Sequence, residues 1–274
     1  MKSPPGDRAF SGSIAQLYER YMVPMIFEPY ARDLTARTVS LDPSSVLEIA
    51  AGTGVVTRHM AAQLPEHVTI VATDLSQPML DHAISIGTSR SVTWQQADAM
   101  RLPFGDESFD AVVCQFGAMF FPDKAAAFAE ARRVLRPGGT FLFNVWDRIE
   151  DNEFADCVTQ SLAQLFPTDP PRFLARLPHG YCDPTAIASD LSQGGFTGAH
   201  VFESVTAQNS AESPRAVATA YCTGTPLRNK IDARNASILR EATDIATVAI
   251  GQRFGLGQIR GKIQAIVTAA MRIA

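Results

Sequence analysis

One short segment constrains the fold of this chain more than any other. The apolar run Val46–Ile49 is followed by Gly52 and Gly54, and Asp74 lies 20 residues after Gly54 (74 − 54), at the end of a second apolar run. The first run predicts a buried β-strand, and the glycines predict a tight turn into a helix where the backbone can approach a ligand. A carboxylate at the end of the next strand is suited to bind ribose hydroxyls. The segment therefore predicts a nucleoside site at one edge of an α/β sheet.

The spacing of the glycines narrows the class of ligand. The dinucleotide fingerprint G-x-G-x-x-G has a third glycine where this chain has Thr57, so a pyrophosphate site loses support. Glu48 adds an acidic group to the strand, where it can order the loop or meet a cationic part of a ligand. A nicotinamide dinucleotide has no ammonium group, whereas S-adenosylmethionine has one. A nicotinamide-dependent oxidoreductase nevertheless stays open as an alternative.

Each of these features also has a purely structural interpretation. Asp74 can cap the helix that Ser76 and Pro78 begin, and Asp98 can be a solvated loop carboxylate. The Pro-Gly-Gly sequence at 137–139 is typical of a helix end and a turn. Because these features follow one another at successive strand ends, together they favour a ligand site at the carboxyl edge of one sheet.

The rest of the pattern alternates between short apolar runs and helical spacing, as in a doubly wound parallel sheet. The predicted strands lie near 46–50, 68–73, 92–96, 109–116, 140–146, 196–205 and 264–272. Helices are expected near 55–64, 78–86, 123–135 and 213–254. An N-terminal helical stretch at 13–36 is expected to break at Pro24 and Pro29. The expected organisation is an N-terminal cap (1–40), a binding core (41–148), a lid (149–182) and the end of the sheet (183–274) with an insert at about 207–260.

The segment Glu48–Gly54 resembles motif I (E/D-x-G-x-G-x-G) of the class I S-adenosylmethionine-dependent methyltransferases, with Ala50 in the first glycine place. The similarity extends over residues 44–147 and is greatest to the bacterial small-molecule group that includes the ubiquinone and menaquinone methyltransferases. This resemblance implies a Rossmann-like, mostly parallel seven-stranded sheet with an antiparallel last strand. It also implies that the N-terminal helices and the helical inserts cover the active site.

The resemblance also implies a cofactor, S-adenosyl-L-methionine, with S-adenosyl-L-homocysteine as its product. Asp74 falls in the place of the acid that binds the ribose, Leu75 meets the adenine, and Asp98 with Ala99 resembles the pair that contacts the adenine edge. The full set of expected cofactor-binding residues is Tyr18, Glu48, Ala50, Gly52, Gly54, Asp74, Leu75, Met79, Asp98, Ala99 and Gln115.

Methyl transfer to a small apolar or aromatic molecule needs alignment and desolvation more than acid–base chemistry. The segment Gln115–Phe121 after the fourth strand holds no base, and His179 is the one histidine that suggests a general base. Aromatic residues are expected either to line an apolar pocket over the methyl group or to pack in the helix core. They are Phe10, Tyr18, Tyr21, Phe27, Tyr30, Phe116, Phe120, Phe121 and Trp146. A cofactor-binding regulatory protein without transfer activity stays open.

Composition excludes several other classes. A net charge of −4 without a basic stripe argues against nucleic acid as a partner. The four cysteines form no C-x-x-C pair, so neither a metal site nor a disulfide framework is indicated. No segment offers the roughly 20 apolar residues of a membrane span. A cytoplasmic protein acting on a small-molecule substrate is expected, as a monomer or a homodimer.

Overall fold

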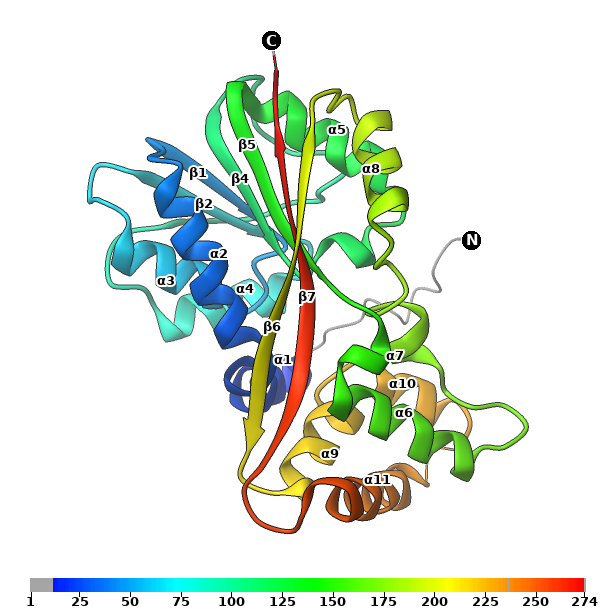
Figure 1. Cartoon of the computed structure of the whole chain (residues 1–274). Helices are drawn as coiled ribbons and strands as arrows, with labels where there is room; N and C mark the ends of the chain where they lie inside the picture. The colour runs from blue at the N-terminus through cyan, green and yellow to red at the C-terminus, as the bar shows by residue number, and fades with distance from the viewer. Residues whose placement is uncertain (1–11, 236, 274) are drawn as a thin grey trace.

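The computed structural model describes residues 12–235 and 237–273, which form a seven-stranded sheet with helices packed along it (Figure 1). The strand order is β3-β2-β1-β4-β5-β7-β6. Strands β1 to β5 pair in parallel, and β7 runs antiparallel to both β5 and β6. The predicted fold class is therefore confirmed. The strands are β1 (Ser45–Ile49), β2 (Thr69–Asp74), β3 (Thr93–Gln96), β4 (Phe109–Gln115), β5 (Leu135–Trp146), β6 (His200–Ala211) and β7 (Ile259–Met271).

The order of the strands reverses between β1 and β4. From β1 the chain winds outward through β2 to β3, and it then returns to place β4 on the other side of β1. Helices α3 (Val55–Gln63), α4 (Gln77–Ile86) and α5 (Lys124–Val134) connect these parallel strands. Ligands of open α/β sheets bind beyond the carboxyl ends of the strands at such a reversal. The topology therefore directs attention to the segments that follow β1, β2 and β4.

The N-terminal helical stretch differs from its prediction. Helix α1 (Gly12–Leu17), the π-helix η2 (Tyr18–Phe27) and α2 (Glu28–Ser40) follow one another without a break. Pro24 lies inside η2, and Pro29 is in the first turn of α2. The expected breaks at both prolines are wrong, because helical backbone continues through Pro24 inside η2 and through Pro29 directly after the π-helical turns change to α-helical ones. Phe10, expected among the pocket aromatics, lies outside the described residues.

Strand and helix limits differ from the predictions mainly in the second half. β5 begins at Leu135 rather than near 140, because Leu135 already pairs with Phe109 on β4. The register then shifts, so that Ala111 pairs with Thr140, and the Pro-Gly-Gly sequence lies in the irregular stretch between these two pairs. The helix expected over 213–254 is three helices, α9 (Pro214–Thr223), α10 (Leu227–Asp232) and α11 (Leu239–Phe254). The segment expected as a lid holds α6 (Glu153–Leu165) and the short α7 (Phe173–Arg176), and α8 (Pro184–Gln193) follows.

Strands β6 and β7 extend beyond the rest of the sheet as a two-stranded ribbon. β5 pairs with β7 only as far as Ala265, whereas the pairing of β6 and β7 continues to Ile259. Helices α6, α7 and α9 to α11 gather beside this ribbon in Figure 1. They therefore stand next to the end of β5, across from the N-terminal helices. Within the described ranges, none of the helices combines the length and the apolar character that crossing a membrane requires.

Candidate functional site

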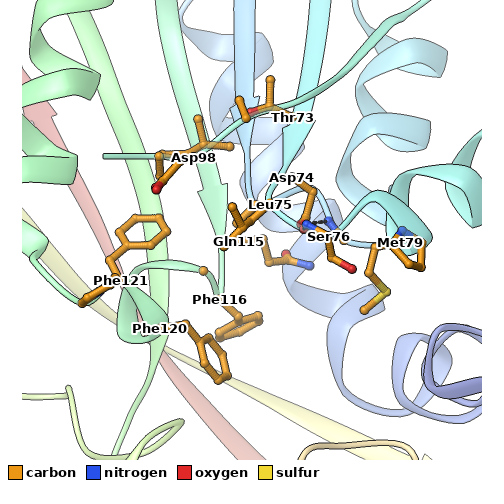
Figure 2. Close-up of a pocket in the computed structure, with 18 of the residues that line it drawn as sticks. Thr73, Asp74, Leu75, Ser76, Met79, Asp98, Gln115, Phe116, Phe120 and Phe121 are labelled. Carbon is orange, nitrogen blue, oxygen red and sulfur yellow. Dashed lines mark hydrogen bonds between the residues drawn. The ribbon is translucent and has the colours of Figure 1, made fainter. Parts of the chain in front are cut away.

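A cavity of about 440 Å³ opens at the carboxyl ends of β1, β2 and β4 (Figure 2). Nine of the eleven residues expected to bind a cofactor line it, namely Tyr18, Ala50, Gly52, Asp74, Leu75, Met79, Asp98, Ala99 and Gln115. Ser76 and Pro78, which the sequence indicated only as a helix start, line it as well, and so do Ile49, Thr73, Ala97, Phe116, Gly117, Phe120, Phe121 and Pro122. The strand ends thus bring together residues that are up to about a hundred positions apart in the sequence.

The carboxylate of Asp74 organises the turn at the centre of this cavity. One of its oxygens accepts a hydrogen bond from the backbone N–H of Gly52 at 2.8 Å, and the other accepts one from Ser76 at 2.7 Å. Burial raises the pKa of Asp74, while the backbone N–H groups of Ser76 and Gly52 act in the opposite direction. Asp74 therefore joins the glycine turn to the start of α4 and keeps its carboxylate at the wall of the cavity.

The two glycines of the turn serve different purposes. Both have a positive φ, 57° at Gly52 and 82° at Gly54, a backbone conformation that a side chain disfavours. A Cβ on Gly54 would lie 2.7 Å from Cη2 of Trp94, so the helix must approach β3 closely there. A Cβ on Gly52 would meet no atom within 4 Å. Gly52 thus leaves open space at the wall of the cavity, whereas Gly54 does not line the cavity and allows close packing.

Glu48 also lies outside the lining of the cavity. Its side chain is 1% exposed, and Oε2 lies 2.5 Å from the hydroxyl of Thr57 on α3. Burial raises the pKa of Glu48 to about 8, an effect that the hydrogen bond with Thr57 and the charge of Arg58 reduce but do not reverse. The carboxyl group therefore carries a proton near neutral pH. It links β1 to α3 behind the glycine turn.

Gln115 ends β4 and brings an unsatisfied acceptor to the cavity. Its Nε2 donates to the carbonyl of Phe27 at 3.5 Å, and its buried Oε1 has no hydrogen-bond partner in the described part of the chain. Figure 2 shows its side chain among the cavity residues, near Ser76. Leaving a buried acceptor unpaired is unfavourable. A ligand with an ammonium or amide N–H group would satisfy it.

Two other residues hold an unusual backbone conformation at the strand ends. Ala50 has a φ of 55° and Phe116 a φ of 50°. The N–H of Phe116 donates to Oδ1 of Asn144 at 2.9 Å, which stabilises the turn after β4. A Cβ on Gly117 would lie 2.5 Å from the Cβ of Ala50, so the two strand ends touch there. The need for a glycine at 117 follows from this contact and from Sγ of Cys114, which would lie 2.7 Å from the same Cβ.

A second cavity of about 70 Å³ lies next to the first. Tyr18, Phe116 and Phe120 line both cavities and therefore stand between them. The smaller cavity is further lined by Met22, Ile26, Phe27, Trp146, Asn152, Phe173, Leu174, Pro178, His179, Tyr221, Thr225, Pro226 and Ile263. The N-terminal helices, the segment expected as a lid and the insert before β7 thus all contribute to it.

Aromatic rings form most of the boundary between the cavities. Phe116 stacks on Trp146 with a centroid distance of 3.7 Å, and Tyr18 stacks on Phe27 at 4.9 Å. Phe121 lines the larger cavity, whereas Tyr21 and Tyr30 line neither. Tyr30 packs its edge against Trp146 and donates its hydroxyl to the carbonyl of Val205. The expected aromatics therefore divide between lining the cavities and supporting them.

His179 lines the smaller cavity in a defined protonation state. Its Nδ1 lies 2.9 Å from the backbone carbonyl of Asp147, and burial lowers the pKa of the imidazole to about 4. The neutral ring must carry its proton on Nδ1, because a carbonyl oxygen only accepts. Nε2 therefore has a free lone pair. Residues 12–235 and 237–273 contain no group of three or more His, Cys, Asp or Glu side chains arranged for a metal ion.

Comparisons with known proteins identify relatives of this chain. The family described as "Methyltransferase domain" matches residues 47–143. A demethylmenaquinone methyltransferase of Deinococcus radiodurans is 34% identical over 151 residues, which cover 50% of this chain and 62% of the relative. A demethylmenaquinone methyltransferase of Mycobacterium bovis is 32% identical over 179 residues, 62% of this chain and 74% of the relative.

A solved structure shows the same fold. The phosphoethanolamine N-methyltransferase 2 of Haemonchus contortus, in complex with phosphomonomethylethanolamine and S-adenosylhomocysteine, superposes with a TM-score of 0.59 at 19% identity. The match covers 98% of this chain and 59% of that one. At this identity the likeness concerns the fold alone. The Deinococcus match spans less than two thirds of its relative.

Proposed function

We propose that this chain, which belongs to the class I S-adenosylmethionine-dependent methyltransferases, transfers a methyl group to a small apolar or aromatic molecule. The observation that carries the proposal is the pair of adjoining cavities. The larger offers Asp74, Asp98 and Gln115 to a polar nucleoside ligand, and the smaller is mostly apolar. Tyr18, Phe116 and Phe120 stand where the two ligands would meet.

The residues of the larger cavity fit S-adenosylmethionine. Asp74 would accept hydrogen bonds from the ribose hydroxyls, and the open space at Gly52 admits the ligand close to the backbone. Asp98 and Ala99 would meet the adenine, and the unpaired Oε1 of Gln115 would accept from the ammonium group. When bound, this cofactor supplies a methyl group on a sulfonium centre. The chain's own task is then to align the acceptor and to exclude water.

A cytoplasmic location is part of the same proposal. Cys114, Cys157, Cys182 and Cys222 are all free thiols, which suits a reducing compartment.

Calorimetry tests the cofactor directly. Titration with S-adenosylmethionine and with S-adenosylhomocysteine is expected to release or absorb heat, and NAD is expected to give none. The absence of binding by both sulfur ligands, or tight binding of NAD, would contradict the proposal.

The variant Asp74→Asn tests the ribose contact. Because a hydrogen bond to a charged group contributes about 1.5–3 kcal/mol, this change is expected to lower the affinity for S-adenosylhomocysteine at least about ten-fold. The matched control is Asp81→Asn on α4, whose exposed carboxylate accepts a hydrogen bond from the side-chain amide of Gln77 and lines neither cavity. An unchanged affinity in Asp74→Asn would reduce Asp74 to a structural link between Gly52 and Ser76.

A further inference from the structure

We infer that the smaller cavity binds the methyl acceptor and that this acceptor is an uncharged molecule with a hydroxylated ring, whose O–H donates a hydrogen bond to Nε2 of His179. The inference rests on the proposed function and specifies its acceptor. It assigns His179 the part of a residue that determines specificity.

The absence of charge in the lining disfavours ionised acceptors. Among the described residues that line the smaller cavity there is no Asp, Glu, Lys or Arg. A buried ion is stable only when an opposite charge and hydrogen bonds compensate its lost hydration. An ammonium group would find no carboxylate in this lining, and a carboxylate or phosphate would find no guanidinium or ammonium group. The lining therefore favours an acceptor that enters uncharged.

The aromatic character of the lining favours a flat ring. Phe116 and Trp146 stack directly on each other, with centroids 3.7 Å and planes 8° apart, and the centroid of Phe27 lies 5.9 Å from that of Trp146, so a ligand would meet the outer faces and edges of these rings. Aromatic rings bind other rings by stacking and by edge contacts. Because Phe116 also lines the larger cavity, a ring against this wall would lie beside the cofactor.

The hydrogen-bonding groups of the lining then select a hydroxyl. Asn152 is committed to backbone carbonyls, including those of Asp147 and Arg148, and Thr225 is committed to the carbonyl of Tyr221. The tyrosine hydroxyls can either donate or accept. His179 differs, because the carbonyl of Asp147 holds its proton on Nδ1 and leaves Nε2 as an acceptor only. Asn152 fixes that carbonyl in turn, so the imidazole has one orientation.

The test uses single-ring probes that share a 4-methylphenyl group, with protein saturated with S-adenosylhomocysteine. The four probes are 4-methylphenol, its methyl ether, 4-methylbenzoate and 4-methylbenzylammonium. Calorimetry or ligand-observed NMR is expected to show the phenol binding roughly ten-fold or more tightly than the ether, since the ether leaves Nε2 unpaired. The two ions are expected to bind more weakly than the ether.

Two substitutions of His179 separate its two nitrogens. His179→Asn places an amide where Nδ1 was, keeps a donor for the Asp147 carbonyl and removes the acceptor, so the preference for the phenol over the ether is expected to disappear. His179→Gln places an amide oxygen or nitrogen near Nε2 and is expected to restore part of it. His200→Asn is the control, because His200 bonds to the carbonyl of Phe196 and lines neither cavity.

The outcomes distinguish this inference from the proposed function. If S-adenosylhomocysteine itself does not bind, the proposed function fails. If it binds and the phenol does not, or if the phenol and the ether bind alike, only the inference fails. Preference for an ion, or a preference for the phenol that survives in His179→Asn, would also overturn it. Nitrogen NMR of wild-type protein adds a measurement that needs no variant, because Nε2 of His179 is expected at the shift of an unprotonated ring nitrogen and to move when the phenol binds.

Discussion

Replacing Glu48 by Gln should make the protein more stable, and increasingly so as the pH rises. The carboxyl of Glu48 is buried against Thr57, and its pKa in the folded chain is about 8, compared with 4.5 for a solvated side chain. Between these values the folded chain holds a proton that the unfolded chain has released. The stability that this proton provides is complete below pH 4.5 and is lost as the pH rises through 8. Glutamine keeps a neutral side chain of the same shape at every pH.

The size of the effect follows from the shift in pKa. A difference of 3.5 pKa units (8 − 4.5) corresponds to about 5 kcal/mol at 1.36 kcal/mol per unit, which is an upper limit. The two proteins are expected to be equally stable near pH 4.5. At pH 8.5 Glu48→Gln should exceed the wild type by at least about 2 kcal/mol, the equivalent of one and a half units. Arg58 lowers and Asp74 raises the pKa of Glu48, and both are present in each protein.

Urea denaturation followed by circular dichroism, without cofactor, measures this difference at intervals from pH 4.5 to 8.5. Comparing the two proteins at each pH cancels the contributions of all other titrating groups. Glu66→Gln is the control, since Glu66 is exposed and should give the same curve as the wild type. A constant difference across the range, or a variant that becomes less stable than the wild type as the pH rises, would refute the reasoning.

Three further predictions concern the strand ends. Gly54→Ala should lower the free energy of unfolding by at least about 2 kcal/mol, because a positive φ adds to a contact of 2.7 Å with Trp94. Gly52→Ala should lower the free energy of unfolding by about 1–2 kcal/mol through backbone strain. Because its methyl group would fill the cavity wall, Gly52→Ala should also weaken the binding of S-adenosylhomocysteine, measured by calorimetry, more than Gly54→Ala does. The reverse order of affinities would contradict this assignment. Gly117→Ala should destabilise by about 1–3 kcal/mol, and adding Ala50→Gly should recover part of the loss in a double-mutant cycle, because the two β-carbons would otherwise lie 2.5 Å apart. Simple additivity in that cycle would show that the strand ends do not touch.

The sequence predicts the turn after β1 because its determinants are local. Gly52 and Asp74 each follow an apolar run, and the chemistry of a tight turn and of a strand end requires those residue types. The roles of Gly54 and Glu48 were harder to predict, since Gly54 is crowded by Trp94 from β3 and Glu48 is enclosed by α3. These contacts exist only once the sheet has formed. The free lone pair of His179 likewise depends on a carbonyl 32 positions away, at Asp147.

The π-helix η2 positions two aromatic rings of the cavity walls, and their position depends on the number of residues between them. Tyr18 and Phe27 are 9 residues apart (27 − 18), which at about 3.6 residues per turn would set them on opposite sides of an α-helix. The wider turns of η2 bring the two rings together instead. Deleting one residue between them would rotate Tyr18 away from Phe27 without removing either ring. Relatives with one residue more or fewer in this interval would then have a cavity of different shape. The acceptor that such enzymes select can therefore change through the length of this helix as well as through substitution of its side chains.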